Sequence, residues 1–230
     1  MKKILIVPLF LLAANLYGWG IGVDGGLSVD FFRNDSLDAI NAGPFPLTVA
    51  KFEVGLNMGF GNINNVTGQA GFIYRQGSAA IGYFDTVENE LVPLNYFVSR
   101  GGSAYYLRHV SGWQPNPAFD FFWGLGPELG ADYQLVNDDN DEEITRALAT
   151  YAGLRLGIGM RLILGGRWEI GLNLFTTVGL GLDVGFGDKI NFPNSMSYSQ
   201  PPEISIRPYP YVANKLGLTV RFWFNRSVSN

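Results

Sequence analysis

Long stretches of the chain alternate between apolar residues and small or polar residues. From Trp168 to Phe186, nearly every second residue is apolar, and the residues between them are mainly glycine, polar or charged. Side chains along a strand point alternately to opposite faces, so this pattern indicates a strand with one apolar and one small or polar face. The same period recurs in segments 19–31, 52–60, 148–164 and 216–224.

The alternation predicts an all-β protein, with eight strands as the expected count and ten as the alternative. The expected strands lie at 19–33, 47–60, 66–84, 94–108, 117–136, 145–164, 167–187 and 208–226. All of them exceed the five or six residues of a typical globular strand, and they also exceed the roughly ten that cross a bilayer at a tilt. We therefore expect a closed antiparallel up-and-down transmembrane β-barrel. A soluble periplasmic barrel remains the alternative, because alternation does not say which face points outward.

Three expected strands carry irregularities. The alternation slips around Gly77 in the third strand and around Gly101 and Gly102 in the fourth, which we interpret as bulges or bends. Pro127 lies inside the fifth strand, where a closed barrel offers no free edge, so we expect a local bulge there.

The connections support the same topology. Four are longer and polar, namely 34–46, 85–93, 137–144 and 188–207, and they alternate with short connections at 61–65, near Trp113–Pro117 and at 165–166. Short turns on one rim and longer loops on the other are typical of outer-membrane barrels. An even number of strands also places both termini on the short-turn side.

Aromatic residues cluster near the ends of the expected strands. Aromatic girdles at the two membrane surfaces would explain this distribution, although aromatic residues also favour strands in general. The residues concerned are Trp19, Phe31, Phe32, Phe119, Phe121, Trp123, Trp168, Phe186, Tyr209, Tyr211, Phe222 and Trp223.

The chain begins with the pattern of a secretory signal peptide. Lys2 and Lys3 precede an apolar run from Ile4 to Ala14, which is too short for a spanning helix. We place the cleavage after Gly18, so residues 1–18 form the signal peptide and residues 19–230 the barrel domain. A short N-terminal membrane anchor is the alternative.

From Trp19 to about Phe224 the sequence resembles the small outer-membrane β-barrel proteins of diderm bacteria, the group that includes OmpA-type, OmpX-type and OmpW-type barrels. The segment Leu216-Gly-Leu-Thr-Val-Arg-Phe-Trp-Phe224 resembles the terminal insertion signal of this family, although Asn225–Asn230 follow it here. The resemblance implies location in the outer membrane, with membrane lipid and the barrel-assembly machinery as partners. It implies little about activity.

In this orientation the polar phase faces the lumen. Opposite charges in a narrow tube should pair, since unpaired charges are unfavourable at low dielectric. We expect a filled, ion-paired interior; a narrow polar conduit or small-ligand pocket is the alternative. The expected lumen-facing charges are Asp24, Asp30, Lys51, Glu53, Asp120, Glu128, Asp132, Arg155, Arg161, Glu169, Asp183, Lys215 and Arg221.

Composition limits the possible chemistry. The net charge of −4 disfavours a nucleic-acid partner, and the absence of cysteine removes thiolate metal sites and disulfides. His109 is the only histidine, and we expect it to lie as an interfacial polar residue near a short turn, away from any nucleophile. Asn137, Asp139 and Asp141 are a weak calcium candidate within an acidic loop that lacks the EF-hand spacing. No other metal and no cofactor is expected.

We therefore expect a non-enzymatic outer-membrane protein with a structural or surface-interaction role. Its external loops, at 34–46, 85–93, 137–144 and 188–207, would meet any external ligand. A narrow channel or carrier for small solutes is the alternative function.

Overall fold

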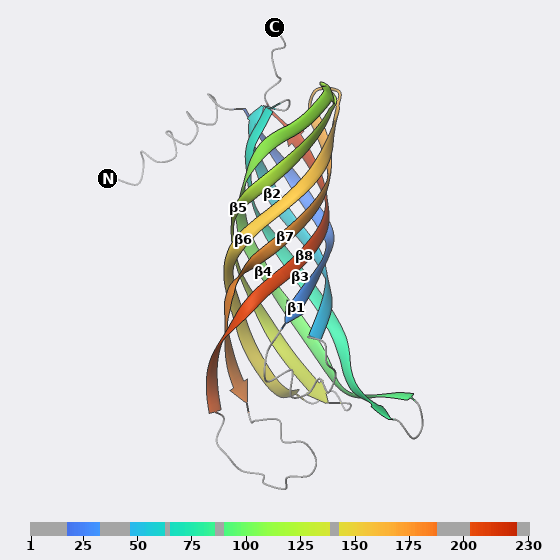
Figure 1. Ribbon diagram of the computed structural model, residues 1–230, viewed down its shortest axis with the longest axis vertical. Coiled ribbons are helices and arrows are strands. Elements are labelled where there is room, and N and C mark those ends of the chain that lie inside the picture. Colours follow the sequence, from blue (N-terminus) through green and yellow to red (C-terminus); the bar gives the residue numbers. More distant parts are fainter. Residues whose placement is uncertain are drawn as a thin grey trace, which may run out of the picture.

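The structure is a computed structural model that describes residues 18–32, 47–62, 65–85, 90–138, 143–187 and 203–224. Adjacent strands pair antiparallel in chain order and β8 pairs with β1, so the sheet closes into an up-and-down barrel (Figure 1). The expected fold is thereby confirmed. The strands are β1 (Trp19–Phe32), β2 (Leu47–Asn62), β3 (Asn65–Asp85), β4 (Glu90–Asn116), β5 (Phe119–Asp138), β6 (Glu143–Leu164), β7 (Trp168–Gly187) and β8 (Glu203–Trp223).

The strands are staggered around the barrel. A path of ladder partners that starts at Trp19 and passes through β2 to β8 returns to β1 at Val29, ten residues further along. Such a stagger tilts the strands by about 40° from the barrel axis. Side chains that meet inside the lumen therefore come from positions that are offset from strand to strand.

The short turns and both described chain ends lie at one end of the barrel (Figure 1). The Gly61 amide donates to the Gly18 carbonyl at 2.9 Å, and the Phe224 amide donates to the Trp19 carbonyl at 3.0 Å. The β6–β7 turn contains Gly165 and Gly166 with φ of 57° and 67°, a left-handed conformation that favours glycine. The longer connections join strands at the opposite end, as the sequence predicted.

Some strands extend beyond the expected bounds. Segment 94–108 is the central part of β4, which runs from Glu90 to Asn116, and β8 begins at Glu203 inside the expected loop 188–207. The turn between β4 and β5 is reduced to Pro117 and Ala118. His109 consequently lies within a strand, and not beside a turn.

The expected bulges at Gly77, Gly101 and Gly102 are wrong. The β3–β4 ladder continues in one register from Gly68 to Ile81, and it shifts only between Ile81 and Gly82. The β2–β3 ladder shifts between Phe60 and Gly61. Inward positions of β3 and β4 carry apolar side chains as well as polar ones. The apolar–polar alternation of the sequence is therefore interrupted in these strands, although the strand pairing is not.

The bulge expected at Pro127 is also wrong. The register of β4 with β5 is the same on both sides of this residue, with Tyr105 opposite Glu128 and Arg108 opposite Leu125. Pro127 is exposed on the outer face, and its ladder with β6 is uninterrupted. The missing amide donor is thus accommodated by a local gap in the β4–β5 pairing, without an extra residue.

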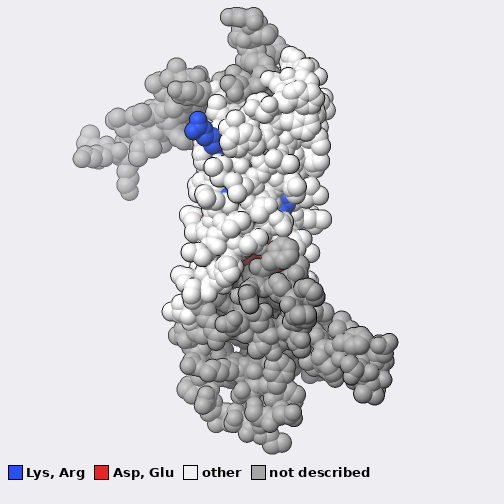
Figure 2. All heavy atoms as spheres, in the orientation of Figure 1, with Lys and Arg blue, Asp and Glu red and all other residues white. Residues whose placement is uncertain are grey.

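Polarity is reversed relative to a water-soluble barrel. Among the described side chains, most buried residues are polar or charged, whereas large apolar residues such as Leu56, Ile158 and Leu180 are 66%, 63% and 74% exposed. Figure 2 shows one face of the barrel, and its described surface is almost free of charged atoms. The described residues include no helix with the length and apolarity of a membrane span.

Aromatic side chains gather on the short-turn rim. The Trp19 ring stacks on Phe224 at 4.2 Å, and Trp168 meets Phe222 edge to face at 5.1 Å between ring centroids. Three residues expected in the girdles lie elsewhere: Tyr209, Tyr211 and Trp223 are buried in the lumen. They share the inward phase of β8 with Lys215, and so they point away from the outer face. The side chains of Phe31, Phe32 and Phe186 lie outside the described part.

Candidate functional site

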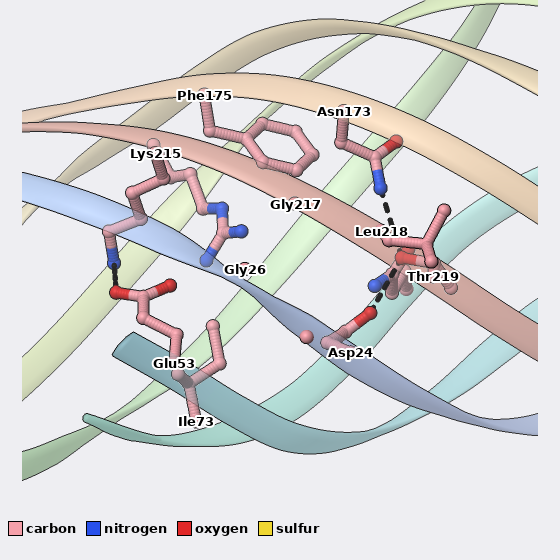
Figure 3. A pocket seen from close by; sticks show the side chains of 13 residues that line it. Asp24, Gly26, Glu53, Ile73, Asn173, Phe175, Lys215, Gly217, Leu218 and Thr219 are labelled. Atoms are coloured by element: carbon pink, nitrogen blue, oxygen red, sulfur yellow. Dashed lines mark hydrogen bonds and ion pairs between the residues drawn. The ribbon is translucent and has the colours of Figure 1, made fainter. Parts of the chain in front are cut away.

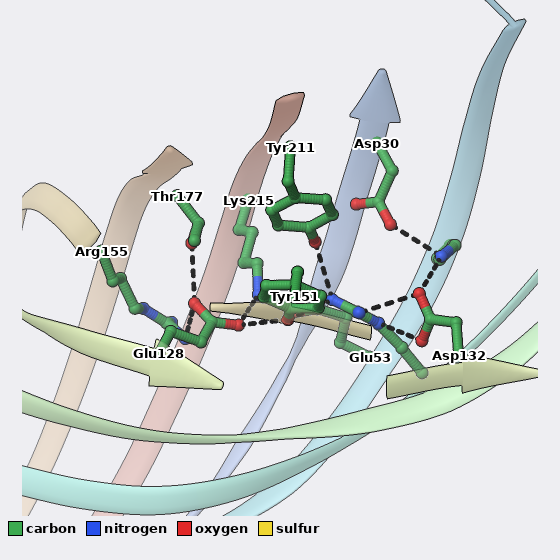
Figure 4. Close-up of polar contacts among 11 residues, drawn as sticks. Asp30, Glu53, Glu128, Asp132, Tyr151, Arg155, Thr177, Tyr211 and Lys215 are labelled. Atoms are coloured by element: carbon green, nitrogen blue, oxygen red, sulfur yellow. Dashed lines mark hydrogen bonds and ion pairs between the residues drawn. The ribbon is translucent and has the colours of Figure 1, made fainter. Parts of the chain in front are cut away.

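The lumen towards the long loops contains a chain of buried ion pairs (Figure 4). Lys51 from β2 lies 2.7 Å from Asp30 of β1 and 2.8 Å from Asp132 of β5. Arg75 from β3 binds Asp132 with two hydrogen bonds, from Nε to Oδ1 at 2.7 Å and from Nη2 to Oδ2 at 2.8 Å. Each charge is thus neutralised by a partner on another strand, as burial requires.

Two tyrosines hold the remaining face of Arg75. Its Nη1 donates to the hydroxyl oxygens of Tyr151 at 2.8 Å and Tyr211 at 3.0 Å. The two rings stack with centroids 3.8 Å apart, and the guanidinium lies 4.8 Å from the Tyr151 ring centroid. Gly130 makes room for this arrangement, because a side chain there would overlap the Tyr151 ring. The tyrosine pair therefore fills the lumen beside the ion pairs.

A second cluster surrounds Glu128 and connects to the first through Tyr151. The Tyr151 hydroxyl donates to Glu128 Oε1 at 2.8 Å, and Thr177 donates to Oε2 at 2.7 Å. Lys215 Nζ lies 2.5 Å from the same carboxylate and 3.6 Å from Glu53. Because Tyr151 accepts from Arg75 and donates to Glu128, the two clusters form one network of hydrogen bonds and ion pairs, which joins side chains of β1, β2, β3, β5, β6, β7 and β8.

The middle of the lumen is partly apolar. The Arg155 guanidinium is sandwiched between the rings of Tyr105 and Phe175, at 4.3 Å and 4.2 Å from their centroids. Ile73 and Leu107 are buried in the same cluster. This layer separates the charges near the loops from those near the short turns.

Asp24 gathers three hydroxyl and amide donors next to this layer. Its carboxylate accepts from Asn57 at 2.8 Å, Tyr105 at 2.6 Å and Thr219 at 2.6 Å. The cavity beside Asp24 measures about 20 Å³, and Figure 3 shows its polar lining and the ring of Phe175. This volume holds about one water molecule, and it is too small for a solute.

The lumen closes towards the short turns with a third set of ion pairs. Arg221 binds Glu169 at 2.9 Å and 3.0 Å, and its Nε donates to Asn57. The Trp223 indole donates to the same Glu169 carboxylate at 2.8 Å. On the facing strands Arg161 pairs with Asp120.

His109 is buried in this layer, which corrects its expected interfacial position. The ring is 7% exposed and stacks on Phe122 at 4.4 Å. Neither ring nitrogen has a hydrogen-bond partner among the described residues. Its inward phase on the extended β4 is the reason for its burial.

The structure places twelve of the thirteen expected lumen charges inside the barrel or at its inner wall, and the side chain of Asp183 lies outside the described part. Sequence reasoning missed Arg75, which donates four hydrogen bonds inside the lumen. The inward phase of β3 also includes Gly71, Ile73 and Gly77, so it lacked the polar signal that marked other strands. The available signal was the position of Arg75 between the exposed Tyr74 and Gln76, in alternation with Phe72, which assigns Arg75 to the inward phase.

The calcium candidate is untested. Asp139 and Asp141 lie outside the described residues, as does the side chain of Asn137. Over the described ranges, no group of three or more histidine, aspartate or glutamate side chains could hold a metal ion.

Comparisons with known proteins show similarity in architecture only. No family model matches the chain, and no curated protein matches it. Neisserial surface protein A is similar with a TM-score of 0.42 and 9% identity over 89% of this chain and 96% of that one. The attachment invasion locus protein Ail of Yersinia pestis gives 0.36 and 10% over 90% and 99%. The outer membrane protein AlkL gives 0.41 and 10% over 93% and 92%. At such identities none of them assigns a role to this chain.

Proposed function

We propose that this protein is an integral β-barrel of the bacterial outer membrane with a closed lumen. In this proposal it has a structural or surface-interaction role through the connections at its long-loop end. The observation that supports it most is the layered network of buried ion pairs and stacked tyrosines across the lumen. Such a barrel seals its own interior and leaves only its ends for contact with partners.

The outer face supports the membrane location. Outward positions of every strand carry exposed apolar side chains, and aromatic rings border them on the short-turn rim. An apolar band flanked by aromatic residues is the pattern of transmembrane barrels, whereas water would penalise it. Export by the N-terminal leader and insertion by the barrel-assembly machinery belong to the same proposal.

The filled lumen favours the surface role over the channel alternative. A solute path would have to pass the Arg75–Asp132 pair, the Tyr151–Tyr211 stack and the sandwiched Arg155, all of which are buried. The loops at 34–46, 85–93, 137–144 and 188–207 were expected to be external. The strands are joined by the connections 33–46, 86–89, 139–142 and 188–202 at the end opposite Gly18 and Phe224. We infer that this end faces the exterior.

Two measurements test the proposal. The unboiled protein from an outer-membrane fraction should migrate differently from the boiled protein, because a closed barrel resists unfolding by detergent. Protease added to intact cells should cleave within the loops at the long-loop end and leave the barrel protected. A processed chain that stays soluble in buffer without detergent would refute the membrane location. Loops cleaved only after the envelope is broken would refute the external role.

A further inference from the structure

The outer face of the barrel has a hollow near the short-turn rim. It measures about 370 Å³ and extends from the end of β4 over β5, β6 and β7 to Leu216 of β8. Apolar side chains line it, including Trp113, Trp123, Ile158 and Leu174. It reaches from the aromatic rim into the apolar band, the direction in which an acyl chain runs in a bilayer.

Arg108 lies on the outer face next to this hollow. The ladder partner of Arg108 on β5 is Leu125. Trp123, which lies two residues before Leu125 in the same strand, lines the hollow. Arg108 is exposed, and among the described residues it has no ion-pair partner. An unpaired arginine on the lipid-facing side of a barrel destabilises it, and this free-energy penalty decreases from the centre of the bilayer towards the headgroups.

The depth of Arg108 follows from the register. Trp19, on the aromatic rim, is linked through Phe60 and Gly68 to Arg108 along one line of ladder partners. Three strand spacings of about 4.8 Å at a tilt near 40° place Arg108 about 9 Å further into the apolar band than Trp19. An arginine side chain can extend over most of that distance, which brings its guanidinium close to the aromatic rim, where the lipid headgroups lie.

We propose that Arg108 and the hollow bind one glycerophospholipid of the leaflet at the short-turn end. The guanidinium binds the phosphate, and the hollow accommodates an acyl chain. This inference rests on the proposed membrane location. A guanidinium forms paired charge-assisted hydrogen bonds with a phosphate, and the ammonium of a zwitterionic headgroup competes for the same oxygens. The site should therefore prefer phosphatidylglycerol to phosphatidylethanolamine.

Native mass spectrometry of the folded, detergent-solubilised protein tests the phosphate contact. With phosphatidylglycerol added, the wild type should retain one lipid, and Arg108→Gln should weaken this retention about tenfold through loss of a charge-assisted contact. Arg100→Gln is the matched control, because Arg100 is also exposed on β4 but lies eight residues nearer the long loops. It should retain lipid as the wild type does.

A second pair of variants tests the hollow. Leu174→Trp fills it and should reduce lipid retention, whereas Leu56→Trp adds the same ring to an exposed position outside it and should not. Equal lipid retention by the wild type and Arg108→Gln would overturn the site. It would also be overturned if Arg108→Gln changed the mass of the protein oligomer without losing lipid. The heat-dependent gel shift of each variant reports the fold separately. Absence of that shift in the wild type would instead contradict the proposed function.

Discussion

Replacing Asp132 by alanine should test whether the lumen is held by buried charge pairs. Asp132 accepts two hydrogen bonds from Arg75 and lies 2.8 Å from Lys51, and all three side chains are almost fully buried. After Asp132→Ala, Lys51 still has Asp30 at 2.7 Å. Arg75 keeps its hydrogen bonds to the hydroxyl groups of Tyr151 and Tyr211, but it loses the carboxylate with which it is in direct contact.

The expected loss follows from these contacts. Two hydrogen bonds to a charged group contribute about 1.5–3 kcal/mol each, and a buried charge without its partner destabilises a fold by about 3–5 kcal/mol. We therefore expect Asp132→Ala to lower the free energy of unfolding by about 3–5 kcal/mol. Arg75→Met should lower it less, because Asp132 then retains Lys51. The double variant Arg75→Met/Asp132→Leu should recover most of the loss, since it removes both charges.

Urea unfolding in phospholipid vesicles, followed by tryptophan fluorescence, measures these free energies. Ser78→Ala, at an exposed position of β3, is the control and should remain close to the wild type. If the free energy of unfolding of Asp132→Ala lies within about 1 kcal/mol of the wild-type value, the Arg75–Asp132 pair is solvated and the lumen is not sealed there. A double variant no more stable than Asp132→Ala would equally refute the reasoning.

Three further predictions use other parts of the barrel. Gly126→Ala should lower the free energy of unfolding by about 1–3 kcal/mol in the same urea titration, because the added Cβ would overlap a carbonyl oxygen of β4. Gly25→Ala is the control and should be tolerated, because an added Cβ there would meet no atom within 4 Å. On the outer face, Leu156→Arg should lower the free energy of unfolding by about 2–4 kcal/mol, whereas Leu164→Arg, near the short-turn rim, should lower it by about 0–1 kcal/mol. Equal losses of stability in the two variants would contradict the membrane orientation. In planar bilayers the wild type should give no conductance over a range of salt concentrations, and Tyr151→Ala, which removes the ring linking the two charge clusters, should give resolved openings.

The strands and their phase were predictable because they depend on local sequence. Alternation over 167–187 and 208–226 identified β7 to within one residue and β8 to within five, and it placed Glu169, Lys215 and Arg221 on the buried phase. The alternation of short and long connections, together with the even number of strands, likewise predicted that the described chain ends at Gly18 and Phe224 lie on the short-turn side. None of these inferences requires knowledge of which residues meet across the barrel.

The partners inside the lumen could not be predicted in the same way. Lys51 and Asp132 are 81 residues apart, and Arg75 and Tyr211 are 136 apart. They meet because the register shifts by ten residues around the barrel, a quantity set jointly by all eight ladders. A list of inward charges therefore predicts that pairing occurs, and it does not predict the pairs.

The two phases of a strand are under different constraints, which explains the errors in β3 and β4. Lipid tolerates few polar groups on the outer face away from the rims, whereas the lumen only requires that side chains fit and that charges are paired. Ile73 and Leu107 meet the inner requirement as well as Arg75 does. In β3 the outward Phe72 and Tyr74 therefore assign the phase more securely than any inward residue. Read from the outer phase, the segment shows no slip at Gly77, and Arg75 falls on the lumen side.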